Sequence, residues 1–180
     1  MNIVVVGIGN ILFKDEGIGV YAGKYLEENY TFEPAVDFVD GGTLGFKLMT
    51  YYHSYDKVMV LDTVSVDDAA GSVCRLSAQE FMDLGTQRNT AHEVEVVEML
   101  EICSLLDTMA EVNVIGIVPE DIESVEIAMT ESMHRNFPAM IAAAIAELES
   151  TGITVRPKPA YLSLEEVIRS YNEPTCAVPA

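Results

Sequence analysis

The stretch Asn2–Gly7 has the sequence NIVVVG, a short β-branched run that predicts a strand buried on both faces. The segment Gly17–Tyr30 follows with a composition that favours a helix, and a second β-branched run, Ala35–Asp40, comes next. A strand, a helix and a strand in this order are typical of parallel strands joined by a helix that covers the sheet. The N-terminal part of the chain therefore indicates an α/β fold.

The same alternation continues towards the C-terminus. Lys57–Asp62 (KVMVLD) is the clearest buried strand, Val112–Val118 is another, and Gly71–Leu76 alternates as an antiparallel edge strand does. Together these runs predict a single-domain, three-layer α/β/α sandwich with a mostly parallel, twisted sheet of about five strands. Residues 1–152 are expected to form this domain, and residues 153–180 a C-terminal tail that is partly helical or disordered.

Further helices are expected along the chain. Ser124–Ser150 contains Pro138, which removes an internal hydrogen bond and should divide or kink the helix there. The other segments with helical composition are Leu44–Tyr52, His92–Asp107 and, in the tail, Ser163–Tyr171.

The charge of the chain excludes several classes of partner. Its 180 residues carry 29 acidic and 10 basic side chains, a net charge of −19, which repels phosphate backbones and anionic lipid surfaces. We therefore expect no nucleic acid and no membrane insertion. The chain has three cysteines, an odd number that does not fit a set of paired disulfides and suggests reduced thiols. Because the N-terminus also lacks the pattern of a signal peptide, we expect a cytoplasmic location.

Polar residues follow several of the predicted strands. In an open parallel sheet, ligands bind beyond the carboxyl ends of the strands, where the loops to the following helices converge. The residues at such positions are Asp15 and Glu16, Asp40 to Thr43, Asp62, and His92 at the predicted start of a helix.

Three familiar kinds of site do not fit these residues. Gly7 and Gly9 resemble the start of a dinucleotide-binding turn, but Leu12 stands where its third glycine belongs and two acids follow. The chain has no GK[ST] phosphate-binding motif and no GxSxG nucleophile elbow. None of the three cysteines follows a core strand beside a histidine, which argues against thiol catalysis.

Glu16, Asp62 and His92 are left as a candidate metal site. Two carboxylates and an imidazole suit a divalent first-row transition metal that keeps open positions for another ligand. The spacing also allows a structural interpretation, in which Glu16 is a first-turn helix acid, Asp62 a turn former and His92 a residue near a helix start. Residue spacing alone leaves both interpretations open.

A longer match favours the metal site. The stretch Gly7–Val20, GIGNILFKDEGIGV, closely resembles the GxGNxLxxDEGxG signature of the nickel-iron hydrogenase maturation endopeptidases. Asp40–Gly45 resembles the DGGTxG segment of that family, and Asp62 and His92 follow in the family's order. The resemblance covers about residues 1–150.

The resemblance implies a specific reaction. Family members remove a C-terminal extension from the hydrogenase large subunit precursor after nickel insertion. It implies that Glu16, Asp62 and His92 recognise nickel supplied by that precursor, with no tightly bound cofactor of the enzyme's own. It assigns Asp40 a catalytic or substrate-positioning role, and residues Gly41, Gly42 and Thr43 a place against the substrate backbone.

Two expectations accompany this reaction. We expect a monomer, because a small protease must admit a large folded substrate. The alternative function is a non-catalytic nickel-sensing chaperone of hydrogenase assembly that uses the same three ligands.

Overall fold

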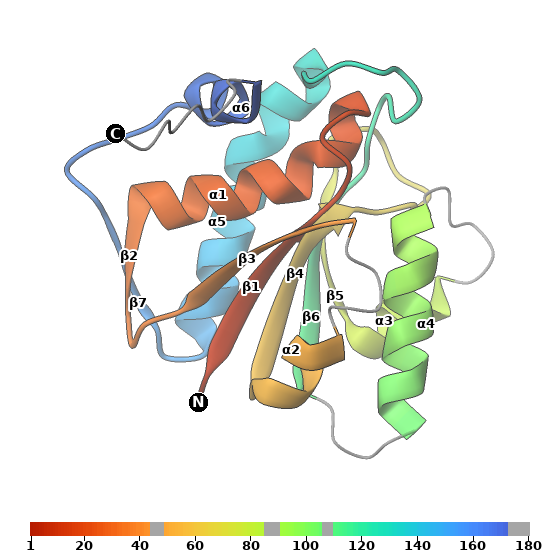
Figure 1. Ribbon diagram of the computed structural model, residues 1–180, viewed down its shortest axis with the longest axis vertical. Helices are drawn as coiled ribbons and strands as arrows, with labels where there is room; N and C mark the ends of the chain where they lie inside the picture. Colours follow the sequence, from red (N-terminus) through yellow and green to blue (C-terminus); the bar gives the residue numbers. More distant parts are fainter. Residues whose placement is uncertain (44–48, 85–90, 106–109, 173–180) are drawn as a thin grey trace, which may run out of the picture.

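The computed structural model describes residues 1–43, 49–84, 91–105 and 110–172; within the third range, the side chains of residues 91–93, 95 and 103–105 are not described. Its main sheet has five strands in the order β3-β1-β4-β6-β5 (Figure 1). All neighbouring pairs are parallel except β5 with β6, which is antiparallel at the edge. The strands are β1 (Ile3–Ile8), β3 (Asp37–Gly42), β4 (Lys57–Thr63), β5 (Val73–Ser77) and β6 (Glu111–Ile117).

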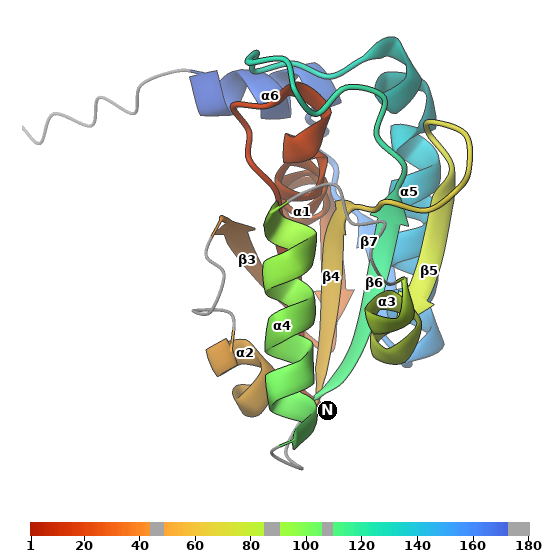
Figure 2. The ribbon, with the colours of Figure 1, turned by 90° about the vertical axis from the view of Figure 1, so that its right-hand side faces the viewer.

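Helices cover both faces of this sheet, which confirms the predicted three-layer fold (Figures 1 and 2). On one face lie α1 (Ile18–Asn29) and α5 (Glu131–Ser150), with α6 (Leu164–Asn172) packed on α1. On the other face lie α2 (Met49–Ser54), α3 (Ala78–Asp83) and α4 (Ala91–Leu105). None of the helices in the described residues is long and apolar enough to cross a membrane.

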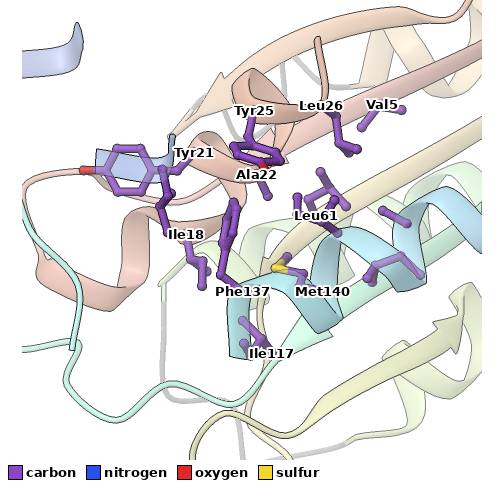
Figure 3. Packing of buried hydrophobic residues seen from close by; sticks show 14 of the residues in the cluster. Val5, Ile18, Tyr21, Ala22, Tyr25, Leu26, Leu61, Ile117, Phe137 and Met140 are labelled. Carbon is purple, nitrogen blue, oxygen red and sulfur yellow. The ribbon is translucent and has the colours of Figure 1, made fainter. Parts of the chain in front are cut away.

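Side-chain alternation along the strands divides the core into two. In β4, Met59 and Leu61 point towards α1 and α5, whereas Val58 and Val60 point towards α4. Figure 3 shows the first of these cores, where the rings of Tyr25 and Phe137 pack against each other near Leu61 and Met140. Because β1 and β4 are buried on both faces, β1 has no polar side chain, and the middle of β4, Val58 to Leu61, is apolar between Lys57 and Asp62.

The helix α5 differs from its prediction. It begins at Glu131, after the N-cap Thr130, and continues through Pro138 to Ser150 as one α-helix. The helix is therefore not divided at Pro138, and the other expectation, a kink at that residue, stays a prediction. Phe137 and Met140 are buried on either side of the proline, and this packing offsets the missing hydrogen bond, whose loss costs about 3 kcal/mol.

A second, small sheet was not predicted. It pairs β2 (Tyr30–Glu33) with β7 (Thr154–Pro157) in the antiparallel direction. Each strand has only four residues, so neither shows enough alternation to be recognised in the sequence. The pairing attaches the chain beyond residue 152 to the end of α1.

A buried network of charges lies at the amino ends of β4 and β6. Glu147 of α5 accepts hydrogen bonds from Lys57 Nζ at 2.6 Å and from Asn113 Nδ2 at 2.9 Å, and it also pairs with Arg75. Lys57 is 3% exposed and Glu147 is 5% exposed, and Glu111 contributes a second carboxylate to Lys57 at 3.0 Å. This network joins α5 to three strands at the edge of the sheet opposite the predicted site.

Candidate functional site

Glycines of the Gly7–Val20 stretch allow the chain to turn closely over the carboxyl ends of β1 and β4. An added Cβ at Gly19 would lie 2.1 Å from the carbonyl oxygen of Leu61. An added Cβ at Gly9, whose φ is +134°, would lie 1.8 Å from the carbonyl oxygen of Glu16. The 3-10 helix η1 (Lys14–Gly17) and the start of α1 therefore rest directly against the end of β4, one residue before Asp62.

Asp15, the first acid of the signature, is a structural anchor. Its side chain is fully buried, and its Oδ1 accepts a hydrogen bond from the backbone N–H of Thr130 at 2.7 Å. Its Oδ2 accepts from the backbone N–H groups of Glu120 and Asp121 at 3.0 and 2.9 Å, and from the Thr130 hydroxyl at 3.0 Å. Asp15 thus ties η1 to the segment between β6 and α5.

We expect Asp15→Ala to lower the free energy of unfolding by about 3 kcal/mol or more, because it leaves several buried donors without their charged acceptor. Urea unfolding followed by circular dichroism measures this loss. Asp67→Ala, at an exposed aspartate, is the matched control and should change stability by less than about 0.5 kcal/mol. Equal stability of the two variants would contradict the anchoring role.

Glu16 and Asp62, two of the three predicted metal ligands, lie at the same edge of the sheet. Glu16 is 8% exposed, and Asp62 is fully buried and accepts a hydrogen bond from the Thr63 N–H at 2.7 Å. Alternation along β4 places Asp62 on the same side as Val58 and Val60, the side that α4 covers. Burying a carboxylate is costly, and a cation at this edge would offset that cost.

His92, the third predicted ligand, is the second residue of α4. The helix runs opposite to the parallel strands, so its N-terminal turn lies at their carboxyl ends, near the end of β4 (Figures 1 and 2). The His92 side chain is outside the described residues. Among the side chains that are described, no group of three histidines, cysteines, aspartates or glutamates could hold a metal ion. The backbone therefore brings the three positions to one edge, while joint ligation remains a proposal.

Asp40 lies on the other face of the sheet. It is exposed, and alternation along β3 places it with Phe38 on the side of α1 and α6. The hydroxyl of Tyr171 in α6 donates a hydrogen bond to Asp40 Oδ2 over 3.4 Å. Burial, followed by the negative charge of Asp40, raises the pKa of Tyr171 well above its ordinary value. Asp40 and Asp62 therefore point to opposite faces.

The three residues after Asp40 form the turn that ends β3. An added Cβ at Gly41 would lie 2.8 Å from Val6 Cγ1, so this glycine is required by close packing on β1. Gly42 has a φ of +41°, and its carbonyl oxygen accepts a hydrogen bond from Gly9 N–H at 3.0 Å. Thr43 is exposed at the end of the turn.

A pocket of about 360 Å³ lies between this turn and the loop that follows β1. Its walls come from the signature, the turn after β3 and the last helix. It is lined by residues 9–12, Val20, Asp40, Gly42, Thr43 and Tyr171. Of the predicted site residues, Asp40, Gly42 and Thr43 therefore meet in one pocket, which Glu16 and Asp62 do not line.

Comparison with known proteins identifies the family. A family model described as hydrogenase maturation protease matches residues 20–147. The chain belongs to the hydrogenase maturation protease family. The family and the enzyme class predicted from the sequence, a peptidase, are thereby confirmed.

Individual members of the hydrogenase maturation protease family resemble the chain over most of its length. The hydrogenase 2 maturation protease of Escherichia coli (strain K12) is 28% identical over 89% of this chain and 98% of its own. The hydrogenase expression/formation protein HupD of Rhizobium leguminosarum bv. viciae is 30% identical over 87% of this chain and 79% of its own.

Solved structures of hydrogenase maturation proteases share the fold. The hydrogenase maturating endopeptidase HybD from Escherichia coli superposes with a TM-score of 0.81 at 28% identity, over 88% of this chain and 98% of its own. The nickel-iron hydrogenase maturation protease HybD from Thermococcus kodakarensis gives a TM-score of 0.67 at 25% identity, over 82% of this chain and 99% of its own.

The sequence alone assigns no role to two residues of this hydrogenase maturation protease, Asp15 and Tyr171. Asp15 stands beside Glu16 in the signature, and nothing in the residue type distinguishes the anchor from the candidate ligand. Tyr171 lies 131 positions after Asp40, and only the packing of α6 on α1 brings the two together.

Proposed function

We propose that this protein removes the C-terminal extension of a nickel-iron hydrogenase large subunit precursor after nickel has been inserted. In this proposal, Glu16, Asp62 and His92 contact nickel that the precursor already holds. The observation that carries it is the convergence of η1, the end of β4 and the first turn of α4 at one edge of the sheet, in a chain of the hydrogenase maturation protease family.

The chemistry of the three side chains supports a substrate-borne nickel. Carboxylates and imidazole are hard or borderline ligands, and this set contains no thiolate. Such a set holds a free divalent ion weakly, yet it can complete the coordination of an ion that another protein already binds. The metal then enters as part of the substrate, and the contact would report that the precursor is loaded.

Asp40 is proposed to act on the peptide rather than on the nickel. It is an exposed carboxylate on the face of the sheet opposite Asp62, and it lies in the 360 Å³ pocket. Hydrolysis adds water across the scissile amide, so the site must orient the carbonyl and handle one proton. A carboxylate in the substrate pocket can do either, by orienting the backbone or by accepting the proton.

The competing function is a nickel-sensing chaperone without peptidase activity. Intact-mass spectrometry of a purified nickel-loaded precursor, before and after incubation with this protein, separates the two. We expect one discrete C-terminal peptide to be released and the remaining subunit to lose the same mass. A stable complex of the two proteins with no change in mass would instead support the chaperone.

A further inference from the structure

Helix α6 is held firmly on α1. Asn29 is 2% exposed, its Oδ1 accepts a hydrogen bond from Leu162 N–H at 2.7 Å, and its Nδ2 donates to the Leu162 carbonyl at 3.0 Å. Ser163 and Glu166 exchange hydrogen bonds across the first turn of α6 at 2.7 and 3.2 Å. The buried side chains of the helix are Leu164, Val167 and Ile168.

This attachment places Tyr171, near the end of α6, between two parts of the molecule. Its ring makes an edge contact with Tyr21 of α1, with 5.6 Å between the ring centroids. Its hydroxyl donates a hydrogen bond to Asp40 Oδ2 over 3.4 Å. This hydrogen bond restricts the Asp40 side chain, which is otherwise exposed to solvent.

The ring of Tyr171 also forms a wall of the 360 Å³ pocket. The other walls bear the apolar side chains of Ile11, Leu12 and Val20, and Leu12 is 51% exposed. The polar side chains of the lining are those of Asn10, Asp40 and Thr43, besides the Tyr171 hydroxyl. Apolar walls with a few polar groups suit an extended peptide whose apolar side chain enters the pocket while its backbone passes the Asp40 turn.

We propose that Tyr171 is a positioning and specificity residue: its hydroxyl orients Asp40, and its ring completes a pocket for an apolar side chain of the substrate peptide. This inference rests on the proposed peptidase function and deepens it. It assigns a role at the site to the C-terminal helix, which lies outside the signature and outside the matched residues 20–147.

Steady-state cleavage of the nickel-loaded precursor tests both parts of the proposal. Tyr171→Phe keeps the ring and should lower kcat about fivefold with KM within about twofold, because one hydrogen bond to a charged group is lost. Tyr171→Ala also removes the wall and should raise KM about tenfold. Tyr161→Phe is the matched control: it removes a tail hydroxyl that contacts Tyr25 at 2.6 Å and should leave both constants unchanged.

A second measurement is independent of proteolysis. Tyr171→Phe should lower the thermal midpoint by about 2 °C in the wild-type background and by nothing measurable in Asp40→Ala, because the side-chain acceptor is then absent. If the wild-type protein cleaves the precursor while Tyr171→Phe and Tyr171→Ala retain its kcat and KM, the role of Tyr171 is refuted and the peptidase function stands. Failure of the wild-type protein to cleave refutes the peptidase function instead.

Discussion

Glu16→Gln and His92→Ala should each abolish precursor processing while the protein stays folded. We expect kcat/KM for the nickel-loaded precursor to fall about 100-fold or more, because each change removes a donor that nickel requires. The protein should stay folded because glutamine has nearly the same volume as Glu16, which is buried, and because alanine is favourable in a helix such as α4. Peptide release measured by mass spectrometry gives the rates, and circular dichroism gives the fold.

Matched controls separate the candidate ligands from other residues of the same type. Glu123→Gln changes an exposed glutamate, and His134→Ala changes a histidine on α5. Both controls should process the precursor at the wild-type rate. Normal processing by Glu16→Gln or His92→Ala would overturn the assignment of that residue.

Glu147→Ala should cause the largest loss of stability, about 3–5 kcal/mol, because it leaves Lys57 buried without its closest partner. The thermal midpoint should fall by about 10 °C. Glu149→Ala, an exposed residue two positions along the same helix, is the control and should have little effect. A midpoint for Glu147→Ala within about 2 °C of this control would show that the network contributes little.

The pH dependence of this effect has a definite direction. Burial alone would raise the pKa of Glu147, but hydrogen bonds and charges from Arg75 and Lys57 outweigh it and leave the pKa lowered. The carboxylate therefore stabilises the fold fully above the pKa of an unfolded glutamate, about 4.3, and this contribution is lost as the pH falls through the lowered folded value. The stability difference between wild type and Glu147→Ala should accordingly shrink in acid.

The two sets of variants probe opposite edges of one sheet. Glu147 lies at the amino ends of β4 and β6, and Glu16 lies beyond the carboxyl end of β4. At a temperature where it is folded, Glu147→Ala should therefore process the precursor normally. Loss of stability and loss of activity are thus separable in this molecule.

The main strands could be predicted because their sequence patterns are complete within a few residues. The run that forms β1 has no polar side chain, and the run that forms β4 is apolar from Val58 to Leu61, since both faces of each strand are buried. The alternation of Gly71–Leu76 correctly indicated β5 as an antiparallel edge strand. By contrast, Pro138 predicts a division that α5 does not have, because the packing of α5 on the sheet is not visible in local sequence.

The candidate site was only partly predictable for the same reason. Its carboxylates follow strands, which sequence shows, but the face to which each side chain points follows from the strand's place in the sheet. Alternation with Val58 and Val60 separates Asp62 from Asp40 once the cores are known. Asp15 and Tyr171 depend on contacts 115 and 131 positions away, respectively, and no local pattern encodes these.

The central claim is that Glu16, Asp62 and His92 bind one nickel ion together. A crystal of the protein soaked in millimolar nickel, with anomalous scattering recorded at the nickel edge, tests it most directly. The claim predicts one peak about 2.0–2.2 Å from an oxygen of Glu16, an oxygen of Asp62 and a ring nitrogen of His92. No peak at these three side chains, or a peak that only one of them contacts, would contradict it.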